Sequence, residues 1–175
     1  TNQELPSYAH AVGAVYRNSD PSDIVVTAAG GLVGEVVQIW KPKELNTFET
    51  EWGFSCMSYE ISGALGIKMA KPDQDVIVFV GDGSYLLQNS DIYSSVLYDK
   101  KLIIVVCDNG GHMVINRLQL AKGGNEYLCN LNAARATNVQ FVDFEAHAKS
   151  MGANGETVKS ISELEAAFKL SLIHI

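Results

Sequence analysis

The sequence predicts an α/β fold with a mainly parallel sheet and helices on both of its faces. Apolar runs rich in β-branched residues, typical of buried strands, occur at 24–27, 76–80 and 102–107, with weaker ones at 136–141 and 156–158. Segments with helical spacing of apolar residues lie at 5–17, 57–69, 91–98, 114–120, 144–151 and 162–170. The alternation of the two favours parallel strands, because each connection must cross back over a face of the sheet.

The individual helices follow from the spacing of their apolar residues. In the first, Tyr8, Val12 and Val15 fall on one stripe. The helix over 57–69 repeats this spacing and contains glycines that permit close packing. The last helix opens with Ser162, whose hydroxyl can cap free N–H groups.

The composition indicates one well-packed domain over residues 1–175. Hydrophobic residues make up 47% of the chain and charged residues 19%, which is too apolar for a disordered protein. The net charge of −7 and the lack of a basic run argue against nucleic acid or an anionic membrane as a partner. No run approaches the roughly 18 apolar residues that a membrane-spanning helix needs.

The cysteines and the chain ends predict the compartment and the extent of the protein. Cys56, Cys107 and Cys129 show no CxxC spacing, which favours a reduced, cytoplasmic protein. The sequence stops shortly after the helix over 162–170, where an α/β domain normally turns and adds another strand. We therefore expect a domain that is truncated at its C-terminus and belongs to a longer polypeptide.

The candidate functional residues follow the ends of two predicted strands. The strand over 76–80 runs into Gly-Asp-Gly-Ser at 81–84, and the strand over 102–107 runs into Asp-Asn-Gly-Gly at 108–111. The carboxyl ends of parallel strands lie at one edge of a sheet, where ligands bind. Magnesium takes hard oxygen ligands, so we expect Asp82, Asn109 and the backbone carbonyl of Gly111 to hold it.

The same turns suit a diphosphate. Gly81 and Gly83 let the backbone approach phosphate groups, and Ser84 can donate its hydroxyl or its N–H at the start of the following helix. A Gly-Asp-Gly turn by itself is also a common strand ending, but its pairing with the second turn favours a site. The sequence is not a dinucleotide fingerprint, because Leu86 stands where a glycine or alanine is needed, and no P-loop lysine follows.

Two further segments have open interpretations. The glycines at 30–34 follow the first strand and form either a second phosphate-facing loop or a plain turn. The polar segment 121–132 is expected to be a surface loop, either one that covers a ligand or an inert connection.

The paired turns resemble the signature of thiamine diphosphate-dependent enzymes, specifically the diphosphate-binding domain of the acetolactate synthase and pyruvate decarboxylase group. The resemblance implies the thiamine diphosphate-binding fold, with magnesium bound by Asp82, Asn109 and Gly111. It also implies that Ser84 and the amides of the glycine turn contact the diphosphate. His112 is a further candidate for contact with the cofactor, although a surface or packing role is the alternative. Three more residues complete the expected cofactor contacts: Gly81, Gly83 and Met113.

The resemblance extends upstream to the segment 55–66. In the family, a large apolar residue at the place of Met57 holds the cofactor in its bent, reactive conformation. The resemblance therefore implies a catalytic role for Met57 alone among the residues of this chain. It also implies that Ser55 contacts the cofactor. Taken alone, Met57 would be an ordinary core methionine.

Within the family, three segments resemble the branch that opens the ring of a cyclic 1,2-diketone in inositol catabolism. These segments are 51–57, 81–92 and 107–118. The resemblance implies a hydrolase that acts on a carbon–carbon bond. Two alternatives stay open: an acetolactate synthase-like or other 2-oxoacid carboligase or decarboxylase, and a non-catalytic diphosphate-binding module for regulation or assembly.

One expected part of the active site has no counterpart in the sequence. Nothing matches the glutamate with which the family activates the aminopyrimidine, and that glutamate belongs to a separate pyrimidine-binding domain. The resemblance implies that this domain comes from the same polypeptide or from a second subunit, in a homo-oligomer such as a dimer. We therefore expect residues 1–175 alone to bind the cofactor weakly or not at all.

Overall fold

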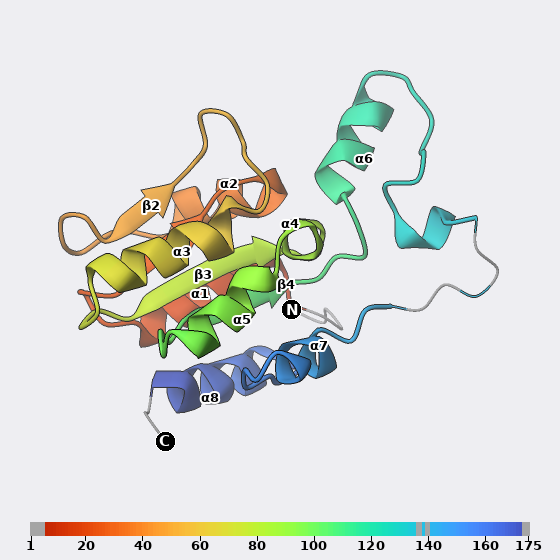
Figure 1. Ribbon diagram of the computed structural model, residues 1–175. Coiled ribbons are helices and arrows are strands. Elements are labelled where there is room, and N and C mark those ends of the chain that lie inside the picture. Colours follow the sequence, from red (N-terminus) through yellow and green to blue (C-terminus); the bar gives the residue numbers. More distant parts are fainter. Residues whose placement is uncertain (1–5, 136–137, 139–140, 173–175) are drawn as a thin grey trace.

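The computed structural model describes residues 6–135, 138 and 141–172. Its centre is a four-stranded sheet in the order β2-β1-β3-β4, and every neighbouring pair is parallel (Figure 1). The strands are β1 (Ile24–Thr27), β2 (Phe48–Thr50), β3 (Val76–Gly81) and β4 (Ile103–Cys107). The predicted parallel α/β class is therefore confirmed.

The described ranges contain eight α-helices. They are α1 (Tyr8–Asn18), α2 (Gly30–Ile39), α3 (Tyr59–Ala70), α4 (Asp82–Leu87), α5 (Ser90–Leu97), α6 (Met113–Ala121), α7 (Phe144–Ser150) and α8 (Ile161–Leu172). A short 3-10 turn, η1 (Leu131–Ala133), follows α6. No helix in the described part of the chain is long and apolar enough to cross a membrane.

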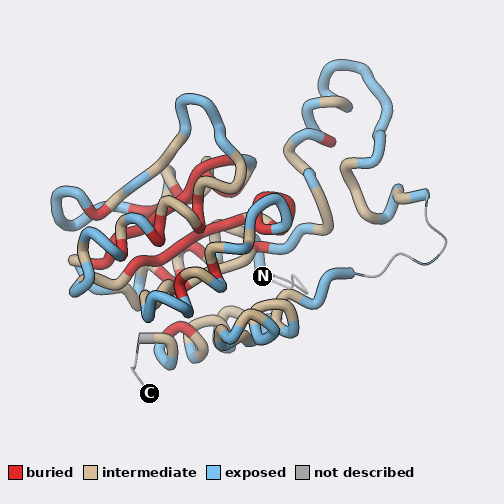
Figure 2. The backbone as a smooth tube through the Cα atoms, in the orientation of Figure 1, coloured by how far each residue is buried: buried red, intermediate tan, exposed pale blue. Residues whose placement is uncertain are grey.

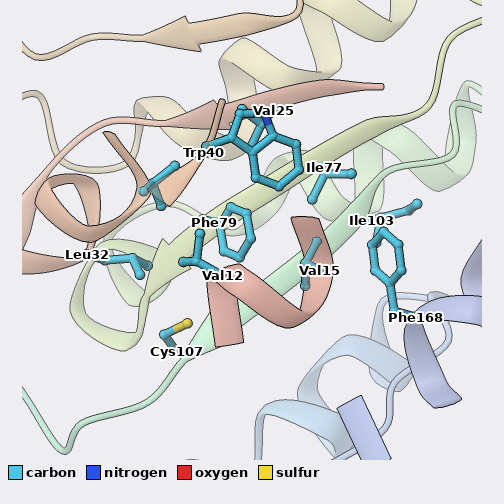
Figure 3. Packing of buried hydrophobic residues seen from close by; sticks show 11 residues of the cluster. Val12, Val15, Val25, Leu32, Trp40, Ile77, Phe79, Ile103, Cys107 and Phe168 are labelled. Atoms are coloured by element: carbon cyan, nitrogen blue, oxygen red, sulfur yellow. The ribbon is translucent and has the colours of Figure 1, made fainter. Parts of the chain in front are cut away.

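Helices cover both faces of the sheet, as the alternation predicts. On one face, α1, α2 and α8 pack against alternate strand residues such as Ile77 and Phe79 (Figure 3). The Trp40 ring meets Phe79 edge-on with centroids 6.0 Å apart. On the other face, α3 and α5 pack against Val78 and Val80. The inner strands β1 and β3 lie at the centre of the buried region in Figure 2, which explains their continuous β-branched runs.

The C-terminal helices close the β4 side of the molecule. α8 joins the first face through Phe168, while α7 joins the second face through Phe144. The Tyr85 hydroxyl on α4 lies 2.9 Å from Nδ1 of His147 on α7. α7 therefore contacts α4, the helix that directly follows β3.

The predicted strand over 156–158 is wrong. These residues form no strand, and the Thr157 N–H instead donates to Oε2 of Glu145 at 2.8 Å, so a side chain satisfies it. In the weaker run at 136–141, residues 136–137 and 139–140 lie outside the described residues, and 138 and 141 are not in a strand.

The start of α8 differs from the prediction, and neither α2 nor β2 was predicted from the sequence. The glycine segment at 30–34 is the first turn of α2 rather than a loop. α8 begins at Ile161, and the hydroxyl of Ser160, not Ser162, accepts the Glu163 N–H at 3.2 Å. The edge strand β2 has only three residues and no fully buried side chain, so it leaves no apolar run in the sequence.

Candidate functional site

The two strand-end turns meet at the carboxyl edge of the sheet. Gly81, the last residue of β3, pairs with Cys107, the last residue of β4, so both turns begin side by side. Oδ2 of Asp82 accepts the Gly111 N–H at 2.6 Å. The structure thus brings two of the predicted magnesium ligands into direct contact.

Asp82 is a buried carboxyl group, with 5% of its surface exposed. Burial raises its pKa, and the nearby Asp108 adds to this, whereas backbone N–H groups of Gly111, Gly83 and Asn109 oppose it. Among the described residues Asp82 forms no ion pair. A divalent cation would stabilise the ionised form that burial disfavours.

Asn109 is oriented by a residue from the start of the chain. Its Nδ2 donates a hydrogen bond to the hydroxyl of Tyr8 on α1. Because the amide nitrogen is engaged, the carbonyl oxygen is the side-chain atom left to bind a cation. The sequence placed Tyr8 only on an apolar stripe, and nothing in the local pattern indicated this contact.

Gly111 has a conformation that only glycine adopts easily, with φ at +139°. A Cβ atom here would lie 2.4 Å from the carbonyl oxygen of Cys129. The Gly111 carbonyl accepts the Met113 N–H at 3.0 Å and keeps a second lone pair for a cation.

The segment after α6 returns to this turn. Asn130 forms a bridge with Gly111, and the Leu131 N–H donates to the Gly110 carbonyl at 2.9 Å. Oε1 of Glu126 accepts from the side chains of Asn116 and Asn130, at 3.0 and 2.8 Å. The end of the polar segment 121–132 is therefore fixed against the second turn, beyond the carboxyl ends of the strands (Figure 1).

His112 lies directly against the first turn. A Cβ atom on Gly83 would be 2.6 Å from Cε1 and Nδ1 of the imidazole, so only glycine allows this approach. His112 is exposed and precedes α6, and the half-buried Met113 is the first residue of that helix. The structure therefore places His112 beside the predicted diphosphate turn.

The Ser84 hydroxyl points into the protein. It donates to Oε2 of Glu60 at 2.8 Å and accepts the Ser58 N–H at 2.6 Å. The hydroxyl and the N–H of Ser84 were the two groups predicted from the sequence as donors to a diphosphate. The hydroxyl is engaged by Glu60, whereas the N–H lies in the first turn of α4, where backbone N–H groups have no partner within the helix. Glu60 was missed, although an acidic residue among the apolar residues of a buried helix is a signal.

The segment before α3 forms an exposed turn that Glu51 closes. The two carboxylate oxygens of Glu51 accept the N–H groups of Phe54 and Cys56, at 3.1 and 2.8 Å. These bonds lower the pKa of Glu51. Ser55 is exposed with φ at +51°, and the half-buried Met57 directly precedes Ser58, which is bonded to Ser84. Met57 therefore lies at the same edge as the first turn.

The donor set fits a magnesium diphosphate. One buried carboxylate, one amide oxygen and one backbone carbonyl are hard oxygen donors, and magnesium commonly completes its shell with phosphate and water. Gly83 and Gly111 stand where a side chain would collide with its neighbours. These two positions require glycine because neighbouring atoms already occupy the space, whereas an added Cβ at Gly81 or Gly110 would meet no atom within 4 Å, which leaves open space beside the backbone there.

Comparison with known proteins identifies the family. Residues 28–174 match the family model described as "Thiamine pyrophosphate enzyme, C-terminal TPP binding domain". The chain belongs to this family. As a thiamine pyrophosphate-binding C-terminal domain, it takes thiamine diphosphate as its cofactor, with magnesium as the usual partner metal of such enzymes.

Several curated relatives share one name, 3D-(3,5/4)-trihydroxycyclohexane-1,2-dione hydrolase. The relative from Lacticaseibacillus casei is 41% identical over 159 residues, which are 91% of this chain and 25% of the relative. Those from Halalkalibacterium halodurans and Bacillus subtilis are 38% and 34% identical, over 91% and 96% of this chain. The chain spans about a quarter of the length of these relatives, 25% and 26% in the last two.

A solved structure shows the same fold. The thiamine diphosphate-dependent 4-hydroxybenzoylformate decarboxylase of Rhodococcus jostii RHA1 superposes with a TM-score of 0.82 and 17% identity, over 98% of this chain and 31% of that one. The thiamine diphosphate-binding fold that the resemblance implied is therefore confirmed.

Proposed function

We propose that this domain serves an enzyme that hydrolyses a carbon–carbon bond of trihydroxycyclohexane-1,2-dione and so opens its ring in inositol catabolism. The observation that carries the proposal is the buried Asp82 carboxyl, joined to Gly111 where the two turns meet. The shared name of relatives at 34 to 41% identity supports the choice of substrate.

Each predicted site residue then has a part in holding the cofactor. The ionised Asp82 carboxylate, the Asn109 carbonyl oxygen and the Gly111 carbonyl bind magnesium. N–H groups of the first turn contact the diphosphate, and Met57 supports the bent conformation. The remaining predicted contacts come from Ser55, Gly81, Gly83, Ser84, His112 and Met113.

Bound thiamine diphosphate supplies a thiazolium group that stabilises a carbanion, and the protein contributes position and electrostatics. The part of this chain would be to neutralise and anchor the diphosphate, because the ionised Asp82 carboxylate would attract a divalent cation to this edge of the sheet. Segment 51–58 and the diphosphate turn are joined through Ser58 and Ser84, so anchoring one end of the cofactor also fixes the residue beside its bend.

The rest of the active site is proposed to come from other parts of the enzyme. A pyrimidine-binding domain, in the same polypeptide or in a second subunit, supplies the activating glutamate and most contacts to the cyclic diketone. Residues 1–175 form a single diphosphate-binding domain within a cytoplasmic homo-oligomer, such as a dimer.

The proposal is tested with the complete enzyme, given thiamine diphosphate, magnesium and either the cyclic diketone or pyruvate. We expect turnover of the diketone only, and its loss in Asp82→Ala. Turnover of pyruvate alone would assign the enzyme to the carboligases and decarboxylases. Cofactor binding without turnover of either substrate would favour a regulatory or assembly module.

A further inference from the structure

Glu60 is a buried carboxyl group that no cofactor contact explains. It lies in the first turn of α3 with 1% of its surface exposed. Its neighbours on the helix, Ile61 and Ala64, belong to an apolar cluster. Burying a carboxyl group is costly, and among the described residues Glu60 has no ion-pair partner. An apolar side chain would fill the space at lower cost, so the bonds that Glu60 makes need an explanation.

These bonds join three segments at the carboxyl edge. Oε2 accepts the Ser84 hydroxyl of the diphosphate turn at 2.8 Å, and Oε1 accepts the Ala29 N–H, between β1 and α2, at 3.4 Å. Ser84 in turn accepts the Ser58 N–H at 2.6 Å. Ser58 follows Met57 directly. The chain of bonds from Glu60 therefore sets the spacing between the diphosphate turn and the Met57 segment.

We propose that Glu60 is a positioning residue for the cofactor site. It acts through Ser84: by accepting the Ser84 hydroxyl it holds the first turn of α4 and the Met57 segment in one rigid arrangement. The cofactor needs this arrangement because its diphosphate and its bend are held at two separate points of the chain. The inference rests on the proposed roles of the diphosphate turn and Met57.

A double-mutant cycle in the complete enzyme tests this role. Glu60→Gln, Ser84→Ala and the double variant are compared with the wild type by calorimetric titration of thiamine diphosphate at saturating magnesium. We expect each single change to weaken cofactor affinity about tenfold, as is typical for residues that orient ligand-binding groups. The double variant should be no weaker than the weaker single variant, because Glu60 acts on the cofactor site through Ser84.

Asp23→Asn is the matched control for a merely structural role. Asp23 is also a buried carboxyl group, with 5% exposed, but it lies before β1, at the opposite end of the sheet. It accepts the Asp20 N–H at 2.8 Å. We expect this variant to lower the melting temperature of the cofactor-free enzyme and to leave cofactor affinity unchanged.

Three results would overturn the inference. The first is that Glu60→Gln binds thiamine diphosphate as tightly as the wild type. The second is that the losses of affinity in the two single variants add up in the double variant. The third is that Asp23→Asn loses as much cofactor affinity as Glu60→Gln does. A wild-type enzyme that binds no thiamine diphosphate would overturn the proposed function as well. Failure of the substrate assay alone leaves this test intact, since it measures cofactor binding.

Discussion

Tyr8 and Asn109 are joined by a side-chain hydrogen bond although 101 positions separate them in the sequence. Burial is the main cause that raises the pKa of Tyr8, to about 12. The phenol therefore stays protonated and uncharged at neutral pH, where it accepts the Asn109 N–H. This contact links the first helix to the turn that follows β4, and it fixes which atom of the Asn109 amide faces away from Tyr8.

Tyr8→Phe should weaken magnesium binding in the complete enzyme. The loss of one hydrogen bond, worth about 1 kcal/mol, would let the amide rotate and reduce magnesium affinity about fivefold. Magnesium titrations at fixed thiamine diphosphate would measure the change. Tyr16→Phe, on the same helix, is the control, because Tyr16 packs on Trp40 rather than on the site. Equal affinities in the wild type and Tyr8→Phe would contradict this role.

Asp82→Ala should abolish magnesium-dependent binding of the cofactor. The variant removes the only charged side chain of the proposed ligand set, and the two neutral oxygens left cannot offset the charge of the ion. Calorimetric titration of thiamine diphosphate with and without magnesium would show the loss. Asp73→Ala, which changes an exposed carboxylate, should bind as the wild type does. Unchanged affinity in Asp82→Ala would remove Asp82 from the metal site.

Gly111→Ala should destabilise the second turn. Its Cβ would lie 2.4 Å from the Cys129 carbonyl oxygen in a strained backbone conformation. Strain of this kind costs about 1–3 kcal/mol. Gly34→Ala is the matched control within α2, where an added Cβ meets no atom within 4 Å. It should stabilise the helix by about 0.5–1 kcal/mol. Thermal unfolding of the two variants should therefore shift in opposite directions.

The stability of the cofactor-free enzyme should depend on pH through Glu60. Burial raises the pKa of Glu60, so the folded protein holds this proton more tightly than the unfolded chain does. The resulting contribution to the free energy of unfolding is complete at pH values below the ordinary glutamate pKa. It is lost as the pH rises through the raised pKa of Glu60 in the folded protein. In that window the melting temperature of the wild type should fall relative to that of Glu60→Gln.

Melting temperatures measured at stepwise pH would reveal this effect of Glu60. Glu44→Gln, which removes one exposed carboxylate, is the control for the loss of a surface charge. Parallel curves of melting temperature against pH for the wild type and Glu60→Gln would contradict a difference in the pKa of Glu60 between the folded protein and the unfolded chain.

Residues 1–175 purified alone should bind thiamine diphosphate weakly or not at all and should not turn over the cyclic diketone. The expected reason is the separate domain that carries the activating glutamate. Calorimetry and a turnover assay on the purified segment would check this. Robust diketone hydrolysis by the segment would show that the active site needs no other domain.

The strands of the core and the two turns could be predicted because local patterns specify them. The inner strands β1 and β3 are buried on both faces and the edge strand β4 is partly buried, so continuous β-branched runs mark all three in the sequence. The edge strand β2 left no such run, because it has only three residues and none of its side chains is fully buried. The run at 156–158 had a suitable composition but has no neighbouring strand in the described part of the chain, and its Thr157 N–H donates to the Glu145 carboxylate instead. Composition alone therefore cannot tell a strand from an extended segment.

The sequence by itself determined the family and the parallel α/β class, and it predicted the residues that we propose to hold magnesium and a diphosphate, since all of these follow from patterns within short segments. Only the tertiary structure decided how these residues are held. The bond from Tyr8 to Asn109 and the bonds of Glu60 to Ser84 and Ala29 join segments that are distant in the chain. Such contacts depend on how helices pack on the sheet, and no spacing within a single segment encodes them.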